Sequence, residues 1–181
     1  PLGGGLPYYH RLLSLAPGEQ VVTPLFWSPA DGGYRVVHAR GLAAGGAVSV
    51  ELKPELFYHG LASLNMASGH STAIVDTEQQ LIARFPAFEE GSSQGGLGKT
   101  IHGAMIETFL ESGQRRGNYR FRSALDGKER FFDAGRIDDL PFVTVVGEEV
   151  SVALAGWVQR LWLYLSIVAT AAGLGGLLLR H

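Results

Sequence analysis

The stretch Leu161–Leu179, LWLYLSIVATAAGLGGLLL, decides the architecture of this chain. It holds no charged residue, and its few polar or amphipathic members are Ser166, Thr170, Trp162 and Tyr164. At about 1.5 Å per residue, a helix of this length reaches roughly 28 Å, which matches the hydrocarbon thickness of a bilayer. Arg160 stands at the upstream flank. The stretch therefore predicts a transmembrane helix over about residues 161–179, rather than the buried core helix of a soluble protein.

The composition of the whole chain excludes several classes of function. The 181 residues carry a net charge of −2 and the 15 Lys and Arg are scattered, so no basic surface points to a nucleic-acid partner. Cysteine is absent, which excludes disulfides and thiolate metal sites and agrees equally with a periplasmic or a cytosolic domain. The start, Pro1–Leu6, lacks the features of a signal peptide, and the first residue is not Met. We expect a fragment or a processed chain, with a missing upstream membrane helix as an open alternative.

The upstream part of the chain predicts three strands between two helices. Residues 8–15 form one or two helical turns. Gly-containing turns join the strand-like runs into an antiparallel meander, and these runs are 21–27, 34–40 and 47–52. A helix then begins at Pro54, a tolerated first-turn position, and ends at Ser68-Gly69. Its expected apolar stripe consists of Leu56, Phe57, Leu61 and Leu64.

The downstream part predicts a complete five-stranded antiparallel α+β unit. Residues 71–75 and 80–85 form a hairpin, and a Gly- and Ser-rich loop leads to a helix over 100–110. Its expected inward residues are Ile101, Met105 and Phe109, with Ile106 and Leu110 as open candidates. Three further strands follow at 118–125, 128–134 and 142–146. The Asp126-Gly127 pair between the first two is a strong hairpin signal. The chain turns helical from Glu148, and since no proline follows Val150, one helix is expected to run from there into the membrane.

No motif in the sequence predicts catalysis, a metal or a cofactor. Gly95–Thr100 resembles the end of a phosphate-binding loop, but Ser93 stands where that pattern needs its first glycine. The six histidines lack metal-ligand spacing. The adjacent carboxylates Asp138-Asp139 and Glu148-Glu149 would diverge on extended backbone. We expect no enzyme, with a membrane-anchored nucleotide-binding enzyme as the rival interpretation.

Cationic and aromatic residues on the strands are the remaining candidates for a ligand site. An Arg in a concave site holds a carboxylate through two parallel hydrogen bonds. Alternation along the strands places Tyr119 with Phe121 on one face and Arg120 with Arg122 on the other. A solvated strand face or a structural ion pair is the alternative for each. The candidate ligand-binding residues are Arg84, Arg120, Arg122, Tyr119, Tyr34, His38 and Arg40.

Four stretches, in this order, resemble the extracytoplasmic double-Cache (PAS-like, PDC) sensor domains of bacterial signalling receptors. They are the hairpin Ile74–Asp76 with Leu81–Pro86, the hairpin Ser123–Arg130, the strand Leu140–Gly147 and the helix start Leu154–Trp157. Together they cover about residues 71–157, the membrane-proximal module of that family. Tyr8–His10, Arg40–Leu42 and Val48–Phe57 are similar, less specifically, to the end of the membrane-distal module. The long N-terminal helix and first strands of the distal module have no counterpart in this sequence.

The resemblance implies an α+β fold with a PAS-like (Cache) antiparallel sheet of five strands and flanking helices. It divides the chain into a partial distal module (1–53), a connecting helix (54–70), a proximal module (71–149) and an exit helix with its transmembrane segment (150–181). The implied function is ligand sensing outside the bacterial inner membrane by a homodimer with a cytoplasmic C-terminus. A small molecule such as a carboxylate or an amino acid would be the ligand, and a diguanylate cyclase or histidine kinase the output module. A membrane-anchored spacer without ligand is the alternative.

Overall fold

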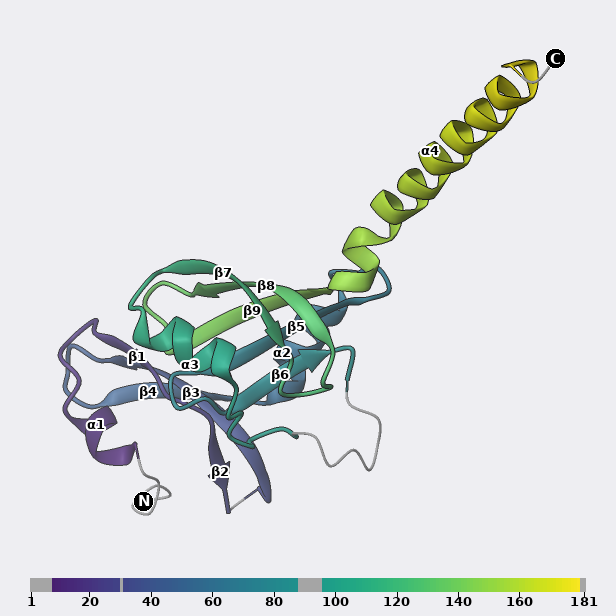
Figure 1. Ribbon diagram of the computed structural model, residues 1–181. Helices are drawn as coiled ribbons and strands as arrows, with labels where there is room; N and C mark the ends of the chain where they lie inside the picture. The colour runs from purple at the N-terminus through teal and green to yellow at the C-terminus, as the bar shows by residue number, and fades with distance from the viewer. Residues whose placement is uncertain (1–7, 30, 88–95, 180–181) are drawn as a thin grey trace.

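The computed structural model describes residues 8–29, 31–87 and 96–179, which form two antiparallel sheets and a long terminal helix (Figure 1). In chain order the elements are α1 (Tyr9–Leu13), β1 (Gln20–Val22), β2 (Phe26–Ser28), β3 (Gly33–Gly41), β4 (Ala47–Leu52), α2 (Pro54–Ala62), β5 (His70–Asp76), β6 (Leu81–Phe85), α3 (Ala104–Glu111), β7 (Arg116–Arg122), β8 (Glu129–Arg136), β9 (Phe142–Glu149) and α4 (Val150–Leu179).

The larger sheet confirms the predicted five-stranded unit. Its strand order is β6-β5-β9-β8-β7, and every neighbouring pair is antiparallel. The turn between β7 and β8 contains the predicted Asp126-Gly127 pair. Gly127 adopts φ +70°, a conformation that glycine reaches without steric cost, and its amide donates to the Ser123 carbonyl at 2.9 Å.

The smaller sheet departs from the predicted meander at its first strand. The run expected over 21–27 is two short strands, β1 and β2, which pair with different parts of β3. Pro24 lacks an amide to donate and stands in the break, where the chain leaves the ladder. Strand β4 pairs with β3 at residues 36–41, while Leu12 of α1 and Leu15 just after it pack against Val37 and Ala39.

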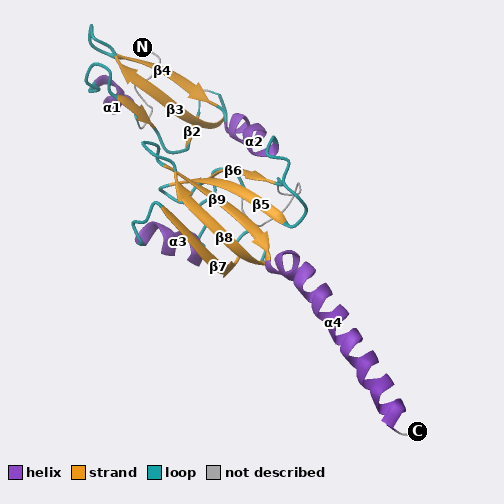
Figure 2. Cartoon of the chain, turned by 90° about the horizontal axis from the view of Figure 1, so that it is seen from above, coloured by secondary structure: helices purple, strands orange, loops and turns teal. Residues whose placement is uncertain are grey.

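Helix α2 is shorter than predicted and lies between the two sheets (Figures 1 and 2). It ends at Ala62 instead of Ser68-Gly69, and the chain passes through a positive φ of 49° at Asn65. The predicted stripe was half wrong, since Leu56 and Leu64 are 58% and 60% exposed. Its packed side chains are instead Phe57, Tyr58 and Leu61.

Helix α3 starts later than the predicted 100–110, because residues 99–101 pair with the chain at the start of β6. The amide of Ile101 donates to the Gln79 carbonyl at 2.8 Å, and Thr100 forms a β-bridge with Gln80. The helix begins at Ala104 and buries Ile106 and Phe109 against the sheet. Long-range pairing therefore overrides the helical periodicity of the first four residues.

Strand β9 runs directly into α4. The expected helical start at Glu148 is wrong, because Glu148 and Glu149 continue the ladder of β9. From Val150 the helix is continuous for 30 residues, as predicted, and projects away from both sheets (Figure 1). Its stretch Val150–Leu174 is long and apolar enough to cross a membrane, and the 18-residue apolar window within this stretch has no buried residue.

One hydrophobic cluster and one carboxylate join the two sheets. Leu25, in the break between β1 and β2, and Val36 of β3 pack with Ile74 and Phe142 of the larger sheet. The carboxylate of Asp76 is fully buried and accepts amide hydrogen bonds from Leu25 at 3.1 Å, Glu78 at 2.9 Å and Gln80 at 2.8 Å. Burial raises the pKa of Asp76, and the three amides offset part of that shift. Asp76 therefore holds both the break after β1 and the β5–β6 turn.

The change Asp76→Ala should lower the free energy of unfolding by about 3 kcal/mol, because buried amides lose a charged acceptor. Chemical denaturation of the chain held in detergent micelles measures this. Asp133→Ala is the matched control, since its side chain is 51% exposed and pairs with an exposed Arg116. Equal stability losses in the two variants would contradict the structural role of Asp76.

Candidate functional site

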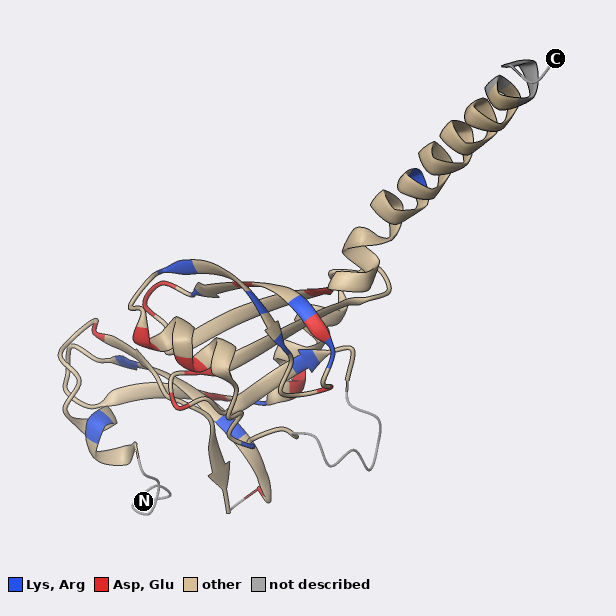
Figure 3. Ribbon diagram, in the orientation of Figure 1, with Lys and Arg blue, Asp and Glu red and all other residues tan. Residues whose placement is uncertain are grey.

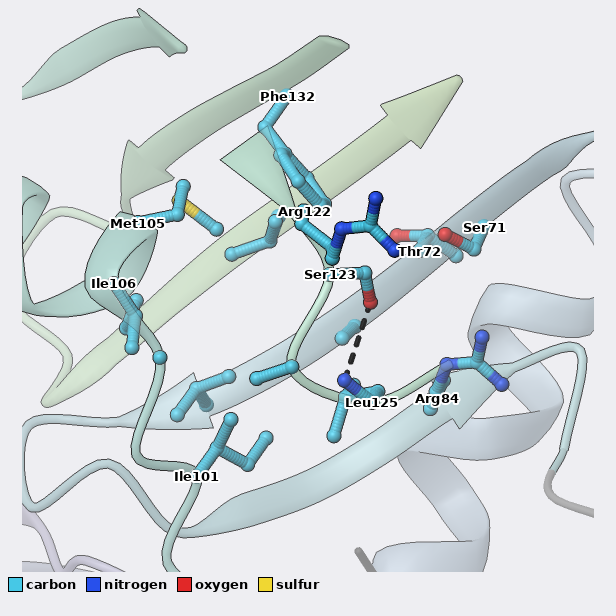
Figure 4. A pocket seen from close by; sticks show the side chains of 15 residues that line it. Ser71, Thr72, Arg84, Ile101, Met105, Ile106, Arg122, Ser123, Leu125 and Phe132 are labelled. Carbon is cyan, nitrogen blue, oxygen red and sulfur yellow. Dashed lines mark hydrogen bonds between the residues drawn. The ribbon is translucent and has the colours of Figure 1, made fainter. Parts of the chain in front are cut away.

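A narrow slot lies between the five-stranded sheet and α3 (Figure 4). Its walls are mostly apolar, with Ala73, Val75 and Val145 from the sheet, Met105 and Ile106 from α3, and Ile101, Leu125 and Phe132 around them. Polar groups stand at its rim: Ser71, Thr72, Arg84, Arg122 and Ser123. The free volume is about 60 Å³, below the roughly 300 Å³ at which sites for small molecules begin. An apolar group of a ligand enters only if the slot widens.

A wider charged groove adjoins the slot and shares Ser71, Arg84 and Leu125 with it. Its volume is about 620 Å³, within the range of small-molecule sites. The groove lies at the end of the sheet from which α4 begins, where basic and acidic segments adjoin in Figure 3. Its charged residues are Arg84, Asp126, Lys128, Arg130 and Glu149.

These five side chains form one ion-pair network. Asp126 Oδ2 accepts from Arg84 Nη2 at 3.1 Å and from Arg130 Nη2 at 2.7 Å. Glu149 Oε1 accepts from Lys128 Nζ at 2.6 Å and from Arg130 Nη2 at 3.3 Å. Burial raises the pKa of Asp126, but hydrogen bonds from Arg130 and Ser123 outweigh it and leave the pKa below the ordinary 3.8. The three cations and two carboxylates leave one net positive charge in the groove.

The four candidate residues of the larger sheet do not form one site. Arg84 lines both the slot and the groove, and Arg122 lines the slot while donating to the Gly127 carbonyl at 3.1 Å. Tyr119 packs with Phe109 beneath α3. Arg120 lies on the face of β7 opposite Tyr119, as the alternation predicted, and pairs with exposed Glu129 at 3.0 Å. The structure thus brings Arg84 and Arg122 to the slot and leaves Arg120 away from it.

The candidate residues of the smaller sheet serve other contacts. Tyr34 packs edge-on against Trp27 and also fills the space beside Gly98, where an added Cβ would lie 2.0 Å from its ring. His38 hydrogen-bonds Gln20 Oε1 at 3.0 Å, and Arg40 is exposed. All three alternate with Val37 and Ala39, which face α1. None of these three residues lines the slot or the charged groove.

The nucleotide-binding interpretation does not fit the geometry of its loop. The amide of Gly98 donates to the Leu81 carbonyl at 2.9 Å, and Thr100 bridges Gln80, so these groups are committed to the sheet edge. A phosphate cradle needs such amides free at a helix start. Gly95 and Ser93 lie outside the described residues. Among the residues described, no group of three His, Asp or Glu is arranged to hold a metal.

Sequence reasoning missed Arg130, whose side chain is only 4% exposed. A signal was present in the alternation of β8. Arg130 shares the inward face with Phe132 and Ala134, and both of those are buried. A cation at an inward position of an alternating strand indicates a buried ion pair, because an unpaired buried charge is too costly.

Comparison with solved structures identifies the fold. The chain resembles an extracellular domain assigned to a histidine kinase, rpHK1S-Z16, at TM-score 0.63 and 18% identity over 83% of this chain and 61% of that one. It also resembles the periplasmic sensory domain of the Campylobacter jejuni chemoreceptor Tlp1, at TM-score 0.61 and 11% identity over 81% and 55% of the two chains. A third similar structure is the ligand-binding domain of the Pseudomonas fluorescens chemoreceptor CtaA with L-leucine, at TM-score 0.51 and 16% identity over 82% and 60%.

These similarities show a PDC/Cache-like sensor fold, as the sequence resemblance implied. The solved domains are an extracellular domain assigned to a histidine kinase, a periplasmic sensory domain of a chemoreceptor and a ligand-binding domain of a chemoreceptor. The chain spans about three fifths of the length of the first of them. No protein-family model and no curated protein sequence matches the chain.

The ion pairs of Asp126 should make the free energy of unfolding depend on pH in the acid range. The pKa of Asp126 is lower in the folded than in the unfolded chain, so its negative charge stabilises the fold when the pH is above the pKa of the unfolded chain. That contribution disappears as the pH falls through the pKa that Asp126 has in the folded chain. Asp126→Asn should therefore lower the free energy of unfolding at about pH 6, and the difference from the unmodified chain should shrink towards about pH 2.5.

Denaturation in micelles at the two pH values measures this difference. Asp133→Asn removes a carboxylate from an exposed ion pair and should cost little at either pH. A loss for Asp126→Asn that stays constant across the pH range would show that the charge is not responsible.

Proposed function

We propose that this chain is the extracytoplasmic ligand-sensing region of a membrane receptor, joined by α4 to a cytoplasmic output module outside this sequence. One observation carries the proposal. A sensor-type sheet has its central strand β9 continued, without a linker, into an apolar helix of 30 residues. A rigid helix transmits a displacement of the sheet, whereas a flexible linker would absorb it.

The proposed architecture assigns residues 1–53 to a partial distal module, 54–70 to the connecting segment, 71–149 to the proximal module and 150–181 to the exit and transmembrane helix. The membrane-spanning part would be about 161–179, in a bacterial inner membrane with the C-terminus in the cytoplasm. A diguanylate cyclase or a histidine kinase is the proposed output. The histidine-kinase and chemoreceptor domains among the similar structures support a signalling role of this kind.

The proposed ligand is a small carboxylate with an apolar part, such as an amino acid. Arg84 stands where the charged groove meets the apolar slot, so a carboxylate at the Arg84 guanidinium would direct its apolar end towards Met105 and Phe132. Similar structures hold L-leucine, L-isoleucine and L-norvaline, which combine these two chemical groups. Ligand entry would have to widen the slot and compete with Asp126 for Arg84.

A second copy of the chain is the proposed partner of α4. Apolar residues recur along one face at alternating steps of four and three: Leu154, Trp157, Leu161, Tyr164 and Val168. All five are exposed, between 39% and 66%. This repeat is the pattern of a two-helix seam, and Gln159, Ser166 and Thr170 lie on the opposite face. Small residues four apart, Ala169 with Gly173 and Ala172 with Gly176, lie off this seam, so close approach of two copies at these residues would use another face of the helix.

A thermal-shift screen of small carboxylates and amino acids should find a compound that raises the melting temperature, because a ligand of the folded state stabilises it. Arg84→Gln should weaken binding of that compound by about 1.5–3 kcal/mol, the range for a hydrogen bond to a charged group. Arg120→Gln is the matched control, since its side chain lies on the other face and should leave affinity unchanged. A screen without any hit would favour the structural spacer, and equal losses in both variants would exclude the slot.

The helix seam can be tested because the native chain contains no cysteine. Leu154→Cys should form disulfide-linked dimers quickly under mild oxidation in lipid nanodiscs, since Leu154 lies on the proposed seam. Gln159→Cys, on the opposite face of the same helix, is the matched control and should stay monomeric. Equal cross-linking at both positions would contradict the seam.

A further inference from the structure

The buried guanidinium of Arg130 touches three separate parts of the protein. It donates to Asp126 in the β7–β8 turn at 2.7 Å, to the Gly69 carbonyl just before β5 at 3.0 Å, and to Glu149 at the end of β9 at 3.3 Å. Its Nε is also buried, and the described residues offer it no hydrogen-bond partner. A charge at 4% exposure needs its carboxylates close by. If either carboxylate moves and Arg130 moves with it, the contact of the guanidinium with the other carboxylate is therefore weakened.

Asp126, one of the partners of Arg130, is connected to the slot. Asp126 is in the turn that supplies Ser123, Ala124 and Leu125 to the slot wall, and it also pairs with Arg84. The turn is held by hydrogen bonds from the Ser123 amide to the Lys128 carbonyl at 2.8 Å and from the Gly127 amide to the Ser123 carbonyl at 2.9 Å. Widening the slot at this rim would move the turn or Arg84, and Asp126 belongs to the turn and pairs with Arg84.

Glu149, the other carboxylate partner of Arg130, is connected to α4. Glu149 immediately precedes the first helical residue, and its amide donates to the Gly69 carbonyl at 2.9 Å. The first turn of the helix packs on the same backbone. A Cβ added at Gly69 would lie 2.5 Å from Val152 Cγ2, and Gly69 has φ +84°. The base of α4 thus rests on Gly69 and is tied by Glu149 to the guanidinium of Arg130.

We propose that Arg130 is the positioning residue that couples the slot to α4, so that a displacement of the Ser123–Gly127 turn changes how firmly the base of the helix is held. The planar guanidinium suits this role because it binds two carboxylates at fixed relative positions. That this coupling serves signalling rests on the proposed sensing function. The coupling itself exists without a ligand and can be measured without one.

The test is hydrogen exchange of the full chain in lipid nanodiscs, followed by mass spectrometry of peptides over residues 147–156 and 121–130. Asp126→Asn removes the charge and keeps an Asn-Gly pair, which favours the same turn. It should speed exchange about tenfold at 147–156, a segment that Asp126 does not belong to. Glu129→Gln, in the neighbouring exposed pair with Arg120, is the control and should leave that segment unchanged.

Coupling is reciprocal, so Glu149→Gln should speed exchange in the turn at 121–130 by a similar factor. In an Arg130→Lys background, where the planar fork is lost, Asp126→Asn should produce no additional change at 147–156. Exchange over β3 reports the general loss of stability in each variant, and the acceleration in the remote segment should exceed that at β3. The proposal is overturned if each variant alters only its own segment, or if β3 loosens equally. A ligand screen without hits would reject the sensing function and leave these exchange results standing.

Discussion

The hydrogen-bond ladder of β9 is the constraint on which the rest of the structure depends. The strand lies between β5 and β8 and pairs with both over most of its length, from Phe142 to Glu149. Its inward residue Val145 forms the floor of the slot, and Phe142 belongs to the cluster that joins the two sheets. Its last residue enters the ion-pair network and its continuation is α4. A shift of this strand would therefore reach every functional part of the chain.

Local chemistry accounts for what the sequence predicted correctly. The Asp126-Gly127 turn, the alternation of β7 and the apolar run of α4 each depend on residues within a few positions of one another. The five-stranded sheet could be predicted because its turns and alternating strands specify it element by element. The start of α3 could not, since the amide of Ile101 bonds to Gln79 through a contact that no helical period reveals. The break between β1 and β2 was missed, although Pro24 within the predicted run 21–27 was a signal for it.

The candidate site was less predictable than the fold, because its members meet only in three dimensions. Arg84 was identified from its position at the end of a hairpin, but its partner Asp126 is 42 residues away. Arg130 reaches the Gly69 carbonyl across 61 residues. Arg120 and Arg122 looked equivalent along the strand. Only the place of β7 at the sheet edge, and the turn beyond it, brings Arg122 to the slot while Arg120 remains with Glu129.

The length of α4 has a mechanical consequence. A straight helix of 30 residues is about 45 Å long, so it acts as a lever whose short arm is its seat on Gly69. A tilt of about 5° at Val150 would move the far end by about 4 Å, which is comparable to the rise of almost one helical turn. Small rearrangements at the seat are thereby magnified at the far end of the helix. Stiffness along the rod and a small, well-defined pivot matter more for such a lever than a large movement of the sensor itself.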